Sequence, residues 1–240
     1  MGFLKKILRD VCRDPECVSS FRGLSEEELE RHMNIRQYGD FVLTDAVSPS
    51  YDLEIVPRTG FRLDAYCDPD TAEEVPALMV SLSEEILFAV FMELIDLLGD
   101  TVDVVLESSH CWEGDDISYE QDDSYREDID TPVLKSFLWE FEDLLLNDGY
   151  TGIAVFNPEI PAEIRLDEHK LIIIYNWLKW PKEVLEILAD HSVPKIPDIE
   201  FICEAEHIHS SSDNFQDQFQ QLKFRLGTDH EMAEEIDDLF

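Results

Sequence analysis

An unbroken apolar run at residues 171–175, Leu-Ile-Ile-Ile-Tyr, predicts the centre of a β-sheet. Three of these residues are β-branched isoleucines, which favour strands. A strand with one solvent-exposed face would alternate polar and apolar residues. A run that does not alternate should therefore be covered on both faces. A turn of buried helix is the alternative. The turn-like residues 167–169 and the β-rich segment 162–166 before them favour a hairpin instead.

Alternating apolar and polar residues predict an antiparallel hairpin nearer the N-terminus. Its strands cover residues 51–56 and 61–67, each with apolar side chains at every second position. Between them, residues 57–60 read Pro-Arg-Thr-Gly, which is the composition of a turn. A further short strand is expected at residues 41–44.

Beyond residue 80 the apolar spacing becomes helical, and helices then alternate with strands. Three helix–strand units and a last helix are expected at 81–98 with 102–110, 131–146 with 152–156, 181–189 with 199–208, and 215–226. The first helix is apolar around most of its circumference, so it should be deeply buried. The pattern predicts an α/β protein, or an α+β protein if antiparallel hairpins dominate. We expect a mixed sheet that starts with the N-terminal hairpin, with helices packed on it.

The chain divides into an N-terminal arm (residues 1–24), a single domain (25–228) and a C-terminal tail (229–240). Ser25 and Glu28 form a capping-box pattern, which predicts that a short helix opens the domain. Apolar residues recur at helical spacing in the arm, at Phe3, Leu4, Ile7, Leu8 and Val11. We expect a short amphipathic helix docked on its own domain, with a peripheral membrane anchor as the alternative. No segment approaches the roughly 18 uninterrupted apolar residues of a membrane span.

Two segments are strongly acidic. Residues 113–130 hold nine acidic residues and one basic residue, so repulsion between like charges predicts a mobile surface loop. The second segment is the tail, whose acidic end closed by an apolar residue resembles the tip of bacterial single-stranded-DNA-binding proteins. That resemblance implies docking into a basic pocket. A last helical turn packed on its own domain, or a frayed tail, is the alternative. The candidate partner-binding residues in the two segments are Asp115, Asp116, Asp122, Asp123, Asp237, Asp238 and Phe240.

Charge narrows the classes of partner. The chain has 55 acidic and 18 basic residues, for a formal net charge of −37. Such a molecule repels nucleic-acid phosphate and anionic lipid, so we expect no direct contact with nucleic acid. The acidity has two explanations. The general one is hydration and dispersion of the protein, notably in a salty environment. The specific one is an acidic face that meets a basic protein or mimics nucleic acid.

Cysteine usage points to a reducing compartment. Five cysteines are present, an odd number, and their spacing is wide apart from Cys12 and Cys17. We therefore expect a cytoplasmic protein. Cys12 and Cys17 lack the second close pair that a four-ligand zinc site would need.

Two histidines are the best candidates for metal ligands. His207 and His209 lie two residues apart on an expected strand, so their side chains project from the same face. Glu204 and Glu206 belong to the opposite face, so a third ligand would have to come from another part of the chain. Histidines at the end of a strand that are only hydrogen-bonded are the alternative.

Other chemical patterns are weak. His110 and Cys111 are adjacent on a strand and would point to opposite faces, so they do not form a nucleophile–base pair by themselves. The segment from Asp115 lacks the glycine of a calcium loop, and no glycine-rich phosphate loop is present. The sequence predicts no cofactor.

These observations favour a non-catalytic binding or regulatory protein over an enzyme, and they predict a basic protein as its partner. Two alternatives stay open. One is a scaffold or subunit without activity of its own, and the other is a metal-dependent hydrolase that uses the strand with His207 and His209.

Overall fold

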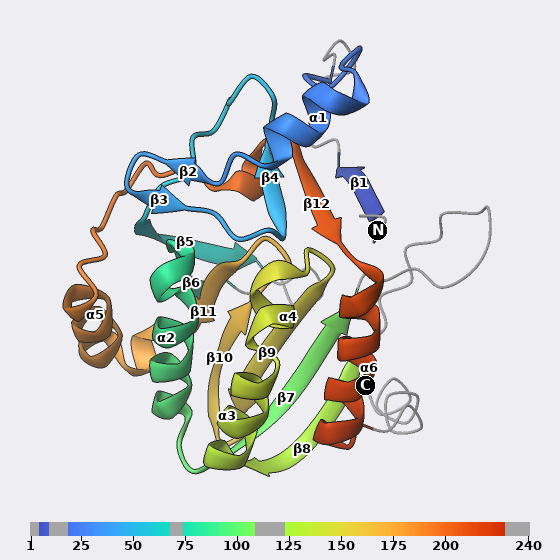
Figure 1. Ribbon diagram of the computed structural model, residues 1–240. Coiled ribbons are helices and arrows are strands. Elements are labelled where there is room, and N and C mark those ends of the chain that lie inside the picture. The colour runs from blue at the N-terminus through green and yellow to red at the C-terminus, as the bar shows by residue number, and fades with distance from the viewer. Residues whose placement is uncertain (1–4, 10–18, 68–73, 109–122, 229–240) are drawn as a thin grey trace.

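A seven-stranded sheet forms the centre of the molecule in the computed structural model, which describes residues 5–9, 19–67, 74–108 and 123–228 (Figure 1). In spatial order its strands are β5 (Gly60–Cys67), β6 (Glu74–Ser81), β11 (Leu171–Tyr175), β10 (Ile160–Leu166), β9 (Thr151–Asn157), β7 (Thr101–Ser108) and β8 (Ser124–Asp130). Each neighbouring pair is antiparallel. The predicted combination of a sheet, helices and an N-terminal hairpin is confirmed, and the antiparallel pairing corresponds to its α+β form.

Strand β11 occupies the interior position that its apolar run predicts. It pairs with β6 on one side and β10 on the other, and Ile172 and Ile174 are fully buried on the face that meets the helices. On the other face Leu171 packs against Ile199 and Phe201. Both faces of the strand are therefore covered.

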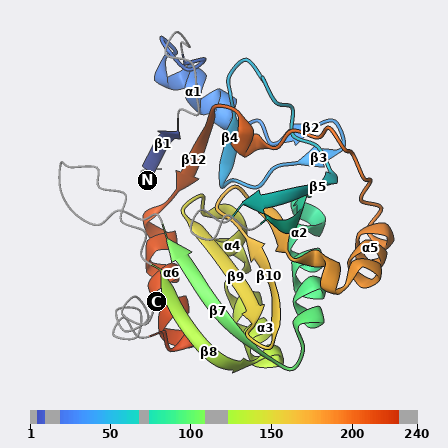
Figure 2. The same ribbon diagram turned by 180° about the vertical axis from the view of Figure 1, so that it is seen from behind.

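Helices cover one face of this sheet and close its core. They are α2 (Glu84–Ile95), α3 (Thr131–Glu140), α4 (Glu142–Asn147), α5 (Pro181–Asp190) and α6 (Asp213–Leu226). Figure 1 shows α2, α3 and α4 across this face, with α5 and α6 at its two ends, and Figure 2 shows the strands from behind. Seven of the twelve residues of α2 are buried, as its nearly continuous apolar surface predicts. Gly99, at φ +100°, ends the short 3₁₀ turn η1 (Asp96–Leu98) that follows α2.

A second, three-stranded sheet lies above the first in the view of Figure 1. Its order is β1 (Lys5–Arg9), β12 (His207–Ser211) and β4 (Val47–Pro49), with all pairs antiparallel. Nearby are α1 (Glu26–Met33) and the short pair β2 (Gln37–Tyr38) and β3 (Phe41–Val42). The predicted capping box of α1 is present, because the Ser25 side chain accepts from the Glu28 amide and the Glu28 carboxylate accepts from the Ser25 amide.

Two N-terminal predictions are wrong. Residues 51–56 form no strand, because Leu53 adopts a left-handed φ of +55° and Pro57 follows. The hairpin is instead made by β5 and β6, one strand later. Lys5–Arg9 is a strand and not an amphipathic helix. Pairing with β12 along all five residues overrides the helical spacing of its apolar residues.

Two later predictions are also corrected. Part of the expected mobile loop 113–130 is ordered, since residues 124–130 form the edge strand β8 and send most of their charges to solvent. The expected strand 199–208 is only a 3₁₀ turn, η3 (Ile202–Glu204), followed by β12. The Glu204 carboxylate accepts from the Phe201 amide (2.7 Å) and pairs with Arg62 (2.7 Å), which competes with extended pairing.

No helix within the described ranges is long and apolar enough to cross a membrane.

Shortening a buried side chain of β11 should destabilise the protein. Ile172→Ala removes a fully buried side chain from the main core, so we expect the free energy of unfolding to fall by about 2–5 kcal/mol. Leu178→Ala, at a side chain that is 54% exposed, should change it by less than about 0.5 kcal/mol. Denaturant unfolding of both variants measures the difference, and equal losses would contradict the assigned core.

Glu107 on β7 gives a pH-dependent prediction. Burial raises the pKa of its carboxyl group to about 7, although Arg165 lies 3.1 Å away and acts in the other direction. Because the pKa of Glu107 lies above its unfolded value, the contribution of this group to stability is fully present below about pH 4.5 and is lost as the pH rises through 7. Glu107→Gln keeps the neutral shape, so it should stabilise the protein at pH 8 by up to about 3 kcal/mol. At pH 4 the gain should vanish, and an equal gain at both pH values would contradict the burial effect.

Candidate functional site

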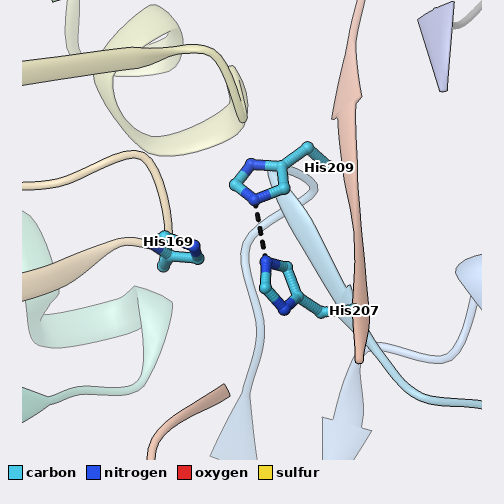
Figure 3. Close-up of side chains that lie close together, drawn as sticks. All are labelled: His169, His207 and His209. Carbon is cyan, nitrogen blue, oxygen red and sulfur yellow. Dashed lines mark hydrogen bonds between the residues drawn. The ribbon is translucent and has the colours of Figure 1, made fainter. Parts of the chain in front are cut away.

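Three histidines meet where the two sheets adjoin. His207 and His209 lie on β12 and project from the same face, with their Nε2 atoms 3.0 Å apart. The third, His169, comes from the tight turn between β10 and β11, and its ring centroid is 4.9 Å and 4.8 Å from those of His207 and His209. Figure 3 shows the His169 ring opposite the pair on β12. We call these three residues the histidine cluster.

The turn that carries His169 is held by one carboxylate. The Asp167 side chain accepts hydrogen bonds from the amides of His169 (3.0 Å) and Leu171 (2.8 Å), and its second oxygen lies 3.0 Å from His169 Nδ1. Lys170 adopts a left-handed φ of +62° and donates from Nζ to the Thr151 carbonyl (2.7 Å). Burial lowers the pKa of Lys170 to about 8, while the nearby carboxylates, including Asp148, act in the opposite direction.

Gly149, two residues after α4, forms the contact between this end of the helix and β12. Its amide donates to the Ser210 carbonyl (2.8 Å), and its own carbonyl lies 2.6 Å from His209 Nδ1. A β-carbon at this position would lie 2.2 Å from the Ala46 carbonyl oxygen. Only glycine allows the main chains to approach so closely, and this approach places His209.

The histidine cluster is enclosed. His207 and His209 are each 1% exposed, and the His169 side chain is 12% exposed. His169, Lys170 and Leu171 also line a cavity of about 20 Å³, together with Phe201 and other residues. This volume has room for about one water molecule. It does not accommodate a substrate of ordinary size.

An acidic cleft of about 450 Å³ lies near the other end of β12. Among the described residues its walls come from α1, α4, α6, β12 and the loop before β4, and they include Glu30, Met33, Asn34, Asp45, Asp143, Asn147, Ser210, Ser211 and Phe215. Asp45 pairs with Arg36 (3.1 Å). Within the described part of the chain, neither Glu30 nor Asp143 has a cationic side chain within 4 Å. Among the described residues, therefore, no basic side chain neutralises the charge of Glu30 or Asp143 in the cleft.

The structure brings together the two histidines on which the sequence prediction of a metal site rests, and it adds His169. The acidic residues near them in sequence are engaged elsewhere: Glu206 binds Ser20 (2.6 Å) and Glu204 binds Arg62. Sequence reasoning missed His169 because no local pattern shows that its turn faces β12. The pair Asp167 and His169 in one tight turn was the available signal.

Most of the predicted partner-binding residues lie outside the described part of the chain. These are Asp115, Asp116, Asp122, Asp237, Asp238 and Phe240, and the same holds for His110 and Cys111. Asp123 is described and is exposed immediately before β8. The carboxylates of the acidic cleft, Glu30, Asp45 and Asp143, come from segments far apart in sequence, so no charge run identified them.

Gly149→Ala tests the close approach that positions His209. The added methyl group has backbone on the opposite side and no flexible side chain that can move away, so we expect a loss of at least about 3 kcal/mol in unfolding free energy. Gly39→Ala is the control. Its φ is +62° but no atom lies within 4 Å of the added carbon, so it should cost only the left-handed strain of about 1–2 kcal/mol. Equal losses for the two variants in denaturant unfolding would be inconsistent with the steric role of Gly149.

Comparison with known proteins assigns no family to this chain. No protein-family model, no curated protein and no solved structure matches it. Its function must therefore be inferred from the geometry and chemistry of its own residues.

Proposed function

We propose that this is a non-catalytic binding protein that engages a basic protein partner through the acidic cleft. The observation that carries the proposal is the cleft itself, about 450 Å³ in volume and lined by Glu30, Asp45 and Asp143. This volume falls within the range of about 300–1,000 Å³ in which protein sites hold ligand groups. A lysine or arginine side chain of the partner supplies the positive charge that Glu30 and Asp143 do not receive from the described residues around them.

The physics of association supports this partner class. A concave surface lined with charge of one sign focuses the field and raises the rate of encounter with oppositely charged groups. Carboxylates form charge-assisted hydrogen bonds with guanidinium groups, often through two parallel N–H···O contacts. The net charge of −37 extends the attraction beyond the cleft and repels nucleic acid.

The histidine cluster does not favour the hydrolase alternative. The cavity beside His169 has room for about one water molecule, so a substrate has no space next to the imidazoles among the described residues. Burial also raises the pKa of the Cys203 thiol to about 12, which keeps it protonated and non-nucleophilic near neutral pH. Cys203 is a free thiol, which agrees with the proposed cytoplasmic location.

A matched pair of double variants tests the cleft. Glu30→Gln with Asp143→Asn removes two charges from the cleft, whereas Glu183→Gln with Asp190→Asn removes two charges from exposed positions on α5. Binding of a fluorescent oligo-arginine peptide to the full chain is measured by anisotropy in low and in high salt. We expect the cleft variant to weaken binding at least about tenfold, which corresponds to about 1.4 kcal/mol. The control variant should change it by no more than about twofold, because salt screens distant charges.

The outcomes separate a defined site from general acidity. Equal effects of the two double variants would show that only the total charge attracts the peptide, and would overturn the assignment to the cleft. Absence of peptide binding in low salt would overturn the basic-partner proposal altogether. Thermal unfolding of both variants checks that each remains folded.

A further inference from the structure

We infer that His169, His207 and His209 form a binding site for a divalent transition-metal ion of the zinc class. This site is separate from the acidic cleft and does not depend on a basic partner. The ligand atoms of the three side chains all lie within 4.8 Å of one another. They come from two segments that only the fold brings together, the β10–β11 turn and β12 (Figure 3).

The hydrogen bonds of the cluster fix how each imidazole is oriented. His207 Nδ1 lies 2.7 Å from the Ala205 carbonyl, and His209 Nδ1 lies 2.6 Å from the Gly149 carbonyl. His169 Nδ1 lies 3.0 Å from the Asp167 carboxylate. Carbonyl and carboxylate oxygens only accept hydrogen bonds, so each Nδ1 carries the proton. A neutral imidazole protonated at Nδ1 presents the lone pair of Nε2, which is the atom that binds metals.

The contact between His207 and His209 then requires a positive centre. Their Nε2 atoms are 3.0 Å apart, and two lone pairs at that distance repel each other in a buried site. Either a shared proton or a metal ion removes the repulsion. Two nitrogen ligands on a tetrahedral ion at about 2.0–2.1 Å lie about 3.3 Å from each other, close to the separation observed. His169 offers a third nitrogen within 4.8 Å of the other two ligand atoms, which a metal needs and a shared proton does not.

The donor set selects the class of ion. Imidazole nitrogen suits Zn²⁺, Cu²⁺, Ni²⁺ and Co²⁺, whereas Mg²⁺ and Ca²⁺ require oxygen ligands. Three protein ligands leave one position of a tetrahedral ion for a further ligand such as water. Hydrogen bonds from ligating imidazoles to carbonyl or carboxylate oxygens typically accompany such sites, and all three histidines have this arrangement.

A bound ion would link the two sheets. His169 belongs to the turn of the seven-stranded sheet, and the other two ligands belong to β12 of the three-stranded sheet. Because the unfolded chain does not hold these ligands together, binding stabilises the folded state in proportion to ln(1 + [metal]/Kd). The role that follows is structural: the ion clamps β12 to the turn.

Metal titration of the full chain tests the site. The protein is stripped with a chelator and titrated with Zn²⁺ or Co²⁺ alone, in competition with a chromophoric chelator. We expect the wild type to bind one more ion per chain than His207→Ala or His209→Ala, and Co²⁺ to show the visible bands of a four-coordinate centre. Zn²⁺ should raise the unfolding temperature of the wild type by several degrees and leave that of these variants unchanged. Asp167→Asn should weaken binding by about 10–100-fold, as loss of an outer hydrogen bond to a ligand does.

The controls account for other ligands in the chain. His191→Ala removes a histidine that pairs with Glu93 (2.9 Å) outside the cluster, so binding should be unchanged. The five cysteines remain in all variants, and the difference between wild type and variant therefore reports the histidine cluster alone. Should a β12 variant fail to fold, His169→Ala in the turn replaces it. Equal metal binding by the wild type and the cluster variants would overturn the inference, and would assign a shared proton to the two Nε2 atoms.

Discussion

The hydrogen bond between the Gly149 amide and the Ser210 carbonyl is the constraint on which the junction of the two sheets depends. It brings the end of α4 against β12 at a distance that no residue with a β-carbon allows. The same glycine presents its carbonyl to His209, so one residue sets both the contact between the sheets and the orientation of an imidazole. Ser210 in turn donates to Ala46, which ties the loop before β4 to the same point.

Charged groups lie in two different environments in this protein, the solvated surface and the buried junction between the sheets. Surface carboxylates are solvated and cost little, even at a net charge of −37, because water and salt screen them. Lys170 is a buried cation whose positive charge is held by its hydrogen bond to Thr151 and by the carboxylates around the turn. It lies next to the histidine cluster, so the junction between the sheets concentrates charge in a region that is otherwise closed to solvent.

Local patterns predicted the elements whose environment follows from neighbouring residues. The apolar run of β11, the nearly continuous apolar surface of α2 and the capping box of α1 can each be read from a short stretch of sequence. Two of the failures have a common cause. Lys5–Arg9 became a strand, and His169 joined the histidine cluster, because of partners far away in sequence that no spacing rule contains. The sequence placed His207 and His209 on one face of a strand, but the ends of that strand and its sheet were decided by tertiary pairing.

The pairing of β1 with β12 has a consequence for how the chain folds during synthesis. Lys5 faces Ser211, so the backbone groups of β1 find their partners only after β12, the last strand of the described residues, has been synthesised. Strands β9, β10 and β11 follow one another directly and form their hairpins over short loops, so they have the low closure entropy of local contacts. On the ribosome the meander of the large sheet therefore assembles while the small sheet is still incomplete, and β12 and α6 are added after it.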